Sequence, residues 1–407
     1  MSSVRECVHA VCISTGITLI LVVRGDLSRG LLWTPEEIDA TQRLDGLDER
    51  LAAAPNQPAV FLITLRDGAP YLGRTTLLRR RLLRLLGRPV RPSRLLNLRA
   101  LASRIEYQLT ASQLETNLVF YEAARSHFPE TYLRLLKLRA PPYLKILLSN
   151  PFPRSHVTTR LGGSRGLIYG PFRSRAAADQ FENQFLDLFQ MRRCREDLAP
   201  TPDHPGCIYG EMNMCLRPCQ QVVGPEEYSS EVGRAVEFLS SGGHSLLDTA
   251  ARARDRLSVE MDFEEAARLH KQVEKVQHVL GMRDELACDI DRLHGVAVTR
   301  SVAPGSVELW FVLGGCWQRP NRFLVEAAGS KAVSLDQRLR EIVTALHPGE
   351  VSARERQEHL ALLARWYYSS YRDGEWVPFA TLDDVPYRKL VRAISRAAHP
   401  KTAPSMP

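Results

Sequence analysis

Two short apolar stretches joined by an Asp-Gly pair constrain the fold of this chain more than any other feature of its sequence. The stretches span residues 59–65 and 69–73, with Asp67 and Gly68 between them. Apolar runs of this length on either side of Asp-Gly are typical of a β-hairpin. Leucines then recur on one side of the segment 77–86, which predicts an amphipathic helix. A hairpin followed directly by a helix predicts an α+β fold.

Arginines cover the opposite side of this helix and continue beyond it. Between residues 74 and 104 the chain has ten arginines but no lysine and no acidic residue. The arginines stand at positions 74, 79, 80, 81, 84, 88, 91, 94, 99 and 104. Burial of the leucines leaves these side chains outward, and an ordinary solvated face usually mixes both charge signs. We therefore expect contact with DNA phosphates, chiefly through Arg79, Arg80, Arg84 and Arg88.

Composition and charge limit the class of protein. With 407 residues, 44% apolar and 25% charged, the chain is long enough for about two to four domains and is neither disordered nor fibrous. The longest nearly apolar run, 10–23, is shorter than the ~20 residues of a membrane span, and no basic leader precedes it. These observations predict a cytoplasmic protein with no membrane partner. The net charge of +8 is compatible with a polyanionic partner.

Patterns elsewhere predict further strands and helices. Strands are expected near 8–23, 144–148, 156–160, 293–299 and 306–313. One helix is expected from Thr34, because Pro35, Glu36 and Glu37 suit a first turn. Further helices are expected over 112–127, 176–189, 225–282 with a break near Met261, and 334–371.

Four cysteines within a segment of 26 residues predict a metal site. They are Cys194, Cys207, Cys215 and Cys219. Thiolates are soft ligands and four of them complete a tetrahedral shell, which suits zinc or an iron–sulfur cluster. His204 is a weaker alternative ligand, and four unliganded core thiols are the plain alternative. The other cysteines are expected to be ordinary core residues, namely Cys7, Cys12, Cys288 and Cys316.

The segment 244–282 has the pattern of a helical hairpin. Asp262 can cap the second helix, and Glu265 three residues later completes a capping box. Apolar side chains then fall near one face of that helix, namely Phe263, Ala266, Ala267, Leu269, Val273 and Val276. Periodicity alone favours an ordinary helical hairpin inside a domain.

In their order and spacing, these motifs resemble the UvrC family, the C subunits of the bacterial nucleotide-excision-repair excinuclease. The β-hairpin, with Tyr71, Gly73 and Arg74 on its second strand, is similar to the family's GIY-YIG nuclease signature. The match to the family continues in the same order through the segments 152–154 and 169–172 and the four cysteines. The segment 262–267 is similar to the family's UVR motif. The resemblance covers residues 57–315.

The resemblance implies a nuclease site and also departures from it. Tyr71, Arg74 and Arg81 match the positions of the family's second tyrosine, its lysine and its arginine. Phe61 stands at the position of the first tyrosine, and the ungapped match puts Phe120 at that of the metal-binding glutamate.

These departures remove groups that the chemistry needs. Phenylalanine has no hydroxyl to activate water, and it cannot bind Mg²⁺, which takes oxygen ligands. Glu122 points to the opposite face of the expected helix, and Glu115 lies about 140° away around it. We therefore expect a degenerate site, with Mg²⁺ bound only if the nuclease is active.

The resemblance also implies a partner, a cofactor and a domain order. A UvrB-like helicase subunit would bind Phe263, Glu264, Ala266 and Ala267, and a [4Fe–4S] cluster is favoured over zinc. The implied order is an N-terminal extension (1–56), a GIY-YIG-like domain (57–140), a linker and cysteine-rich module (141–224), a helical region with the UVR-like hairpin (225–285) and a C-terminal α/β remnant (286–407). That remnant resembles the start of the family's RNase H-like part, and the rest of that nuclease and the helix-hairpin-helix repeats are expected to be missing.

The leading hypothesis is a UvrC-like excision-repair protein that binds DNA and a UvrB-like partner through a degenerate nuclease scaffold. One alternative is an active GIY-YIG endonuclease that makes a single metal-dependent nick in damaged DNA. Another is an interaction adaptor with no DNA role. Phe61 and Phe120 favour a binding protein over an enzyme, and the arginine run disfavours the adaptor.

Overall fold

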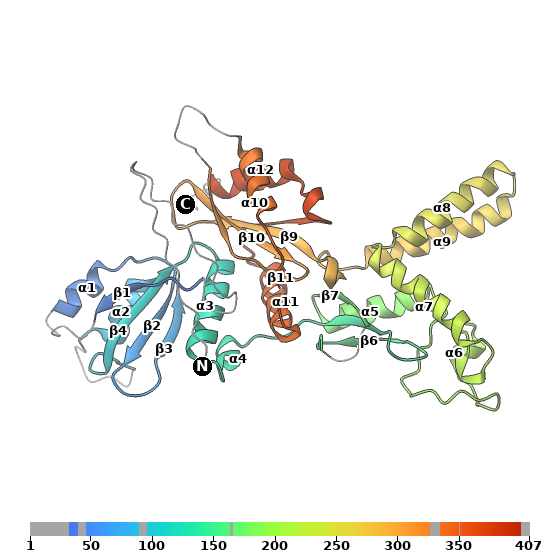
Figure 1. The fold of residues 1–407 in the computed structure, drawn as a ribbon, viewed down its shortest axis with the longest axis horizontal. Helices are drawn as coiled ribbons and strands as arrows, with labels where there is room; N and C mark the ends of the chain where they lie inside the picture. The colour runs from blue at the N-terminus through green and yellow to red at the C-terminus, as the bar shows by residue number, and fades with distance from the viewer. Residues whose placement is uncertain are drawn as a thin grey trace, which may run out of the picture.

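The structure is a computed structural model in which residues 32–39, 46–88, 96–162, 166–325, 334–349 and 351–399 are described. Within these ranges the strands form three antiparallel sheets, and a pair of long helices forms an arm that projects from the body (Figure 1). The fold is therefore α+β, as the sequence predicts. None of the helices in these ranges combines the length and apolar character that a membrane span requires. The strands expected near 8–23, together with Cys7 and Cys12, lie outside the described residues.

The N-terminal lobe is built on the sheet β1-β4-β2-β3. Its strands are β1 (Glu36–Asp39), β2 (Ala59–Leu65), β3 (Tyr71–Thr75) and β4 (Ala102–Leu109). The pairing of β2 with β3 confirms the predicted hairpin. Helices α1 (Leu47–Ala53) and α2 (Leu78–Leu86) pack on one face of the sheet, and α3 (Gln113–His127) packs on the other, followed by α4 (Tyr132–Leu136). The Ser112 hydroxyl accepts a hydrogen bond from the Glu115 N–H and caps α3.

The helix predicted from Thr34 is wrong, because this segment forms strand β1. Glu36 and Ile38 pair with Tyr107 and Ile105 of β4, respectively. Ile38 packs against the core between the sheet, α1 and α2, and the Tyr107 hydroxyl donates to the Glu36 carboxylate over 2.6 Å. Pairing with an exposed strand edge therefore outweighs the local helix-start signal.

The middle of the chain forms a second sheet, β6-β5-β7-β8. Its strands are β5 (Tyr143–Leu147), β6 (Ser155–Thr158), β7 (Gly166–Gly170) and β8 (Cys288–Asp289). Helices α5 (Arg175–Leu186) and α7 (Pro225–Ser240) pack on it through a core rich in phenylalanine. Between these helices lies the cysteine-rich segment, whose regular elements are α6 (Ile208–Glu211) and the 3₁₀ turn η2 (Pro218–Gln220).

The arm consists of α8 (His244–Val259) and α9 (Phe263–Gly281), which confirms the predicted helical hairpin (Figure 1). The Asp262 carboxylate caps α9 by accepting a hydrogen bond from the Glu265 N–H at 3.2 Å. The Asp262 N–H donates to the Leu257 carbonyl. A second break, which the sequence analysis missed, separates α7 from α8. Gly243 has φ +91° there, and a Cβ at this position would lie 2.5 Å from the side chain of Leu280.

The C-terminal lobe contains the third sheet, β11-β10-β9-β13, with β12 also paired to β10. The strands are β9 (His294–Arg300), β10 (Ser306–Leu313), β11 (Cys316–Trp317), β12 (Asn321–Leu324) and β13 (Glu375–Phe379). The short 3₁₀ turn η3 (Ile290–Arg292) precedes the sheet, and η4 (Leu382–Asp384) follows it. The predicted pairing of 293–299 with 306–313 is confirmed. The predicted helix over 334–371 is two helices, α10 (Leu335–Thr344) and α11 (Ala353–Tyr367), and α12 (Tyr387–Ala398) follows β13.

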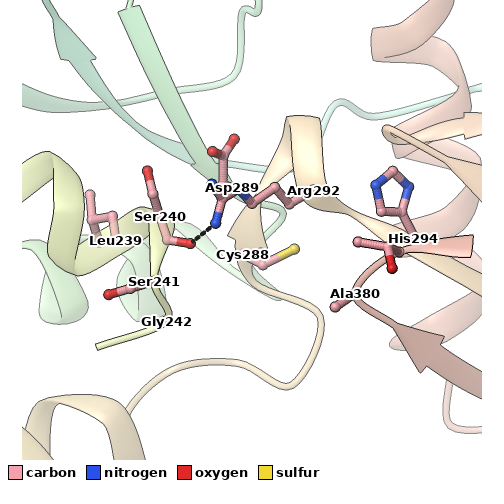
Figure 2. A pocket seen from close by; sticks show the side chains of 10 residues that line it. Leu239, Ser240, Ser241, Gly242, Cys288, Asp289, Arg292, His294 and Ala380 are labelled. Carbon is pink, nitrogen blue, oxygen red and sulfur yellow. Dashed lines mark hydrogen bonds between the residues drawn. The ribbon is translucent and has the colours of Figure 1, made fainter. Parts of the chain in front are cut away.

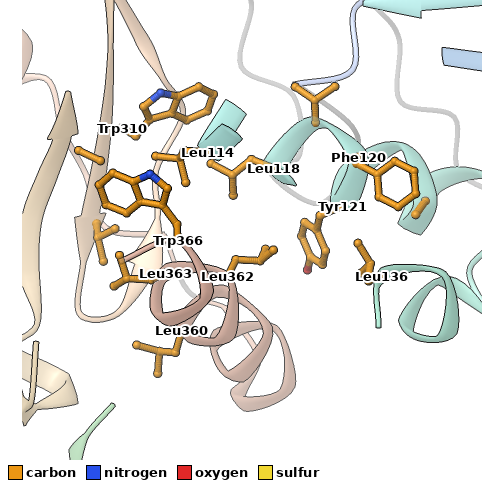
Figure 3. Close-up of a cluster of buried hydrophobic side chains, with 14 of the residues drawn as sticks. Leu114, Leu118, Phe120, Tyr121, Leu136, Trp310, Leu360, Leu362, Leu363 and Trp366 are labelled. Atoms are coloured by element: carbon orange, nitrogen blue, oxygen red, sulfur yellow. The ribbon is translucent and has the colours of Figure 1, made fainter. Parts of the chain in front are cut away.

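Alternating residues of β9 and β10 face two different cores. Val298 and Phe311 pack against α10 and α12, whereas Ala297 and Trp310 face α11. Helix α11 in turn packs against α3 and α4, so one hydrophobic core joins the N-terminal and C-terminal lobes (Figure 3). The buried Glu358 of α11 strengthens this junction by accepting hydrogen bonds from the hydroxyls of Tyr121 and Tyr132, at 2.8 and 2.7 Å.

Candidate functional site

The residues that the resemblance assigns to a nuclease site form two groups on the sheet of the N-terminal lobe. In the first group, Arg81 of α2 donates to the Tyr71 hydroxyl at 2.9 Å. The Phe61 ring is fully buried with its centroid 6.1 Å from that of Tyr71. Phe61 lies opposite Gly73, where a Cβ would stand 2.5 Å from the ring. The glycine of this motif therefore makes room for the phenyl ring.

The second group lies on the face of the sheet that α3 covers. Arg74 donates to the Asn117 side-chain oxygen at 2.5 Å, and its guanidinium lies over the Phe120 ring, 5.2 Å from the centroid. Phe120 is only 7% exposed and belongs to the core shared with α11 (Figure 3). Partial burial lowers the pKa of Arg74 from its ordinary value, and the positive charge of Arg365 lowers it further.

Sequence reasoning missed Asn117 and Arg365 as parts of this second group. Asn117 precedes Phe120 by about one helical turn, so its presence on the same side of α3 was open to inference from spacing. Arg365 comes from α11, and no local pattern connects it with Arg74. Its guanidinium donates to the carbonyls of Leu136 and Lys137, both at 3.1 Å, which fixes it beside α4.

The two glutamates nearest to Phe120 in sequence already have other partners. Glu115 accepts a hydrogen bond from the Ala111 N–H at 2.7 Å and is buried, and burial raises its pKa to about 7. Glu122 accepts from the N–H groups of Leu32 and Trp33, the latter at 3.0 Å. Both carboxylates therefore support local structure rather than facing the Arg74 group.

Six of the eight described arginines of the run are exposed, as the sequence predicts, but several of them are held by contacts within the protein. Arg79 donates to the Ala54 carbonyl at 2.7 Å, and Arg88 and Arg99 both pair with Asp48. Asp48 carries a lowered pKa, because Arg99 hydrogen-bonds it and both arginines attract it.

Arg79, Arg80 and Arg84 are the exposed arginines of α2, and no ion pair of their side chains is seen among the described residues; of the three, Arg79 is held by the Ala54 carbonyl. Arg104 pairs with Glu37 and Glu106. Arg91 and Arg94 lie outside the described residues. Acidic residues therefore neutralise part of the positive charge that the arginine run offers to a polyanion.

The four clustered cysteines lie in one module with free thiols. Burial raises the pKa of the Cys215 thiol to about 11, and negative charge on the other three sulfurs adds to the rise, so all four lie within electrostatic reach of one another. In the described ranges, however, no three His, Cys, Asp or Glu side chains are close enough together to hold a metal ion. His204 accepts from the Gly206 N–H at 3.0 Å.

A buried arginine stands beside these thiols. Arg192 is 1% exposed, and its guanidinium donates to the carbonyls of Phe152 and Glu196 and contacts the Cys194 sulfur at 3.5 Å. Its second terminal nitrogen is buried without a hydrogen-bond partner in the described structure. An orphaned cationic donor next to the Cys194 thiol fits an anionic group such as a cluster with thiolate ligands.

The tip of the arm carries exposed apolar side chains. Phe263 is 66% exposed, and Met261 and Val259 in the adjoining turn are 77% and 83% exposed. Ala266 is buried against α8, whereas Glu264 and Ala267 face outward. Of the apolar residues predicted near one face of α9, Ala266, Val273 and Val276 are therefore buried, whereas Phe263 and Ala267 are exposed.

A cavity of about 620 Å³ lies at the base of the arm, where the end of α7 meets the C-terminal lobe (Figure 2). Arg292 crosses it and donates to the Ser240 carbonyl at 2.8 Å. Cys288 lines the cavity, and burial raises the pKa of its thiol to about 12. The thiol is therefore protonated and unreactive at neutral pH.

Large parts of this chain are similar in sequence to known proteins. A family model described as the middle domain of UvrC/Cho excinuclease matches residues 141–238, which include strands β5, β6 and β7 of the second sheet, the cysteine-rich segment and most of α7. The UvrABC system protein C of Moorella thermoacetica is 24% identical over 330 residues, or 79% of this chain and 53% of that protein. The proteins of the same name from Dehalococcoides mccartyi and Acetivibrio thermocellus are 24% and 22% identical over 66% and 79% of this chain.

The chain spans about half the length of the curated relatives it matches. No solved structure matches it. The middle-domain match, together with the similarity that extends over both flanking regions, supports a UvrC-family protein.

Proposed function

We propose that this chain acts in nucleotide-excision repair by binding DNA and a UvrB-like partner, and that its GIY-YIG-like site does not cut DNA. The relatives named as protein C of UvrABC systems support the repair role. The observation that carries the rest is the buried Phe120 ring beneath the Arg74 guanidinium. A divalent ion there would meet a phenyl ring and a positive charge where it needs oxygen ligands.

The groups that remain suit phosphate binding. Arg74 is a cation close to the strand edge, and Arg81 with Tyr71 forms a hydrogen-bonded pair on the other face. Guanidinium groups bind phosphate oxygens through paired N–H donors. Because a phenyl ring, and no carboxylate among the described residues, lies beside Arg74, these residues can hold a phosphodiester but offer no carboxylate ligand for the ion that would generate the attacking hydroxide.

The decisive experiment is a nicking assay on damaged duplex with Mg²⁺ and the B subunit, run beside a gel-shift assay. We expect the unmodified protein to bind but not to nick, and a variant with Phe61→Tyr and Phe120→Glu to nick in a Mg²⁺-dependent way. Robust nicking by the unmodified protein that Tyr71→Phe abolishes would establish the active endonuclease instead. Binding to the B subunit without any binding to DNA would establish the adaptor.

The proposed partner surface is the tip of the arm. Val259, Met261 and Phe263 expose apolar side chains close together, and Glu264 lies beside them. Large exposed apolar side chains on a projecting element are typical of protein–protein contact sites. A matching helical hairpin of a UvrB-like subunit is the occupant that the family resemblance favours.

We further propose that Cys194, Cys207, Cys215 and Cys219 converge on a [4Fe–4S] cluster, with zinc as the alternative. Arg192 beside Cys194 supports the anionic form of such a site. Anaerobic purification, metal analysis and visible absorption distinguish the two, and Cys215→Ser should lower metal content while Cys316→Ser should not. A colourless, metal-free and well-folded protein would contradict the proposal.

A further inference from the structure

Helix α12 separates its apolar and charged residues completely. Leu390, Ala393 and Ile394 are buried against the C-terminal sheet. The opposite side presents four exposed cations and no acidic residue, namely Arg388, Lys389, Arg392 and Arg396. Three of them follow one another at intervals of four residues, about 6 Å along the helix axis. The helix therefore carries a continuous cationic stripe on the outer side of the lobe, at the top of Figure 1.

This stripe is only partly neutralised. Arg396 pairs with Glu375 at the start of β13, with one contact of 2.6 Å. The pKa of Glu375 is lowered chiefly by Arg396, and then by the charges of Arg372 and Lys389, so one carboxylate faces three cations. In the part of the chain that the structure describes, Arg388, Lys389 and Arg392 form no ion pair. A surplus of positive charge therefore faces solvent.

An exposed aromatic ring lies in the turn that leads into Glu375, the carboxylate that pairs with Arg396 of the stripe. Tyr371 lies in the turn 369–374 between α11 and β13 and is 91% exposed. Its neighbour Arg372 lies over the Tyr367 ring, 4.5 Å from the centroid. The turn is anchored on both sides, because Trp366 donates to the Asp373 carbonyl at 3.0 Å and the Gln113 N–H of α3 donates to the Asp373 carboxylate. The exposed ring therefore sits on a fixed support.

We propose that α12 and Tyr371 form a second nucleic-acid surface that takes single-stranded DNA. The cations of α12 neutralise successive phosphates, and Tyr371 stacks on an unpaired base. This pairing of a basic track with an exposed aromatic ring is how proteins hold single strands without sequence preference. The inference deepens the proposed function, on which it rests for the identity of the polyanion.

Hydrogen bonds link the turn that carries Tyr371 with the Arg74 group of the N-terminal lobe. Gln113, which hydrogen-bonds Asp373 below Tyr371, also donates from its side chain to Asn117 at 3.5 Å. Asn117 is the residue that accepts from Arg74. The turn that carries Tyr371 and the Arg74 guanidinium are therefore both held by α3.

The test is fluorescence anisotropy on the full chain, with labelled oligothymidine and a duplex of the same length. Tyr371→Ala should weaken binding of the single strand about 5- to 100-fold, and Tyr371→Phe, which keeps the ring, should not. Lys389→Ala with Arg392→Ala should reduce the slope of log K against log salt for the single strand by about 1.4. The matched control is Lys271→Ala with Lys275→Ala, which removes the same charge from the exposed side of α9 and should change neither value.

Three results would overturn the inference. Unchanged single-strand binding in the Tyr371 and α12 variants, with duplex binding still weakened by Arg80→Ala and Arg84→Ala, would leave the proposed function intact and remove this surface from it. Equal losses in the α12 and α9 pairs would show that only net charge matters. Failure of the unmodified protein to bind either DNA would reject both the inference and the DNA-binding part of the proposed function.

Discussion

Among single residues, Glu115 shows how the N-terminal lobe uses a carboxylate that lies near a suspected metal position. It is 6% exposed, accepts the Ala111 N–H and follows the Ser112 cap of α3. Burial disfavours its charged form, which raises the pKa to about 7, and the charges of Glu308 and Asp373 act in the same direction. The residue therefore destabilises the folded protein when it ionises.

Replacing Glu115 by Gln should remove a pH-dependent loss of stability. The folded pKa of about 7 lies above the value of 4.5 of an ordinary glutamate, so stability falls as pH rises between these values. At pH 8 the Gln variant should be more stable by up to about 3 kcal/mol, and near pH 4.5 the two proteins should be alike. Urea unfolding at both pH values measures this difference. A Glu274→Gln control changes an exposed charge on α9 and should show no such trend.

The residues of the suspected nuclease site were predictable to different degrees. Phe61, Tyr71 and Phe120 follow from motif spacing, because each lies in a strand or helix whose local pattern is strong. The partners of these residues were not predictable in the same way. Arg365 reaches the Arg74 region from α11, and sequence periodicity carries no information about which distant helix lies across a surface.

Among the elements, α2 is expected to contact DNA through a small number of side chains. Its exposed Arg80 and Arg84 should contact phosphates, so replacing both with Ala should reduce the slope of log K against log salt for duplex DNA by about 1.8 without changing sequence preference. Titrations at several salt concentrations measure the slope. Arg88→Ala is the contrasting variant, because Arg88 pairs with Asp48 and its loss should affect stability more than the slope. A slope that stays unchanged in the double variant would exclude α2 from the interface.

The arm should bind its partner through side chains that its own fold does not need. Phe263→Ala should weaken association with a UvrB-like subunit by about 2 kcal/mol or more, about 30-fold in Kd, because exposed aromatic anchors dominate such contacts. Its melting temperature should stay the same, since Phe263 is 66% exposed. Calorimetry gives both values. Val276→Ala, which opens a cavity in the buried face of α9, should lower the melting temperature instead.

Elements with complete local signals were predictable, and elements that depend on a distant partner were not. The β2–β3 hairpin and the capped helix α3 carry turn and cap residues in their own sequence. Strand β1 was mistaken for a helix because its pairing with β4 overrides the signal of Pro35, Glu36 and Glu37. The contacts of Arg79 and Arg88 were not predictable for the same reason, since the Ala54 carbonyl and Asp48 lie far from these arginines in the sequence.

For the whole molecule, the core that α11 shares with α3 predicts coupled stability of the two lobes. Leu363 is fully buried in that core, so Leu363→Ala should cost about 2–5 kcal/mol. Hydrogen exchange should accelerate in α3 as well as in β9 and β10, because both lobes lose contacts. Leu390→Ala, in a core confined to the C-terminal lobe, should accelerate exchange there and leave α3 protected. Acceleration limited to the C-terminal lobe in the Leu363 variant would show that the lobes unfold independently.

The shared core also determines how long part of the nascent chain stays uncovered during synthesis. Helices α3 and α4 leave the ribosome about 230 residues before the end of α11, which at about 5–20 residues per second is a delay of about 10–45 s. During this time Leu118, Tyr121 and Leu136 have no α11 to cover them. The growing polypeptide therefore exposes this apolar helix surface for much of its synthesis, until the last helix of that core is made.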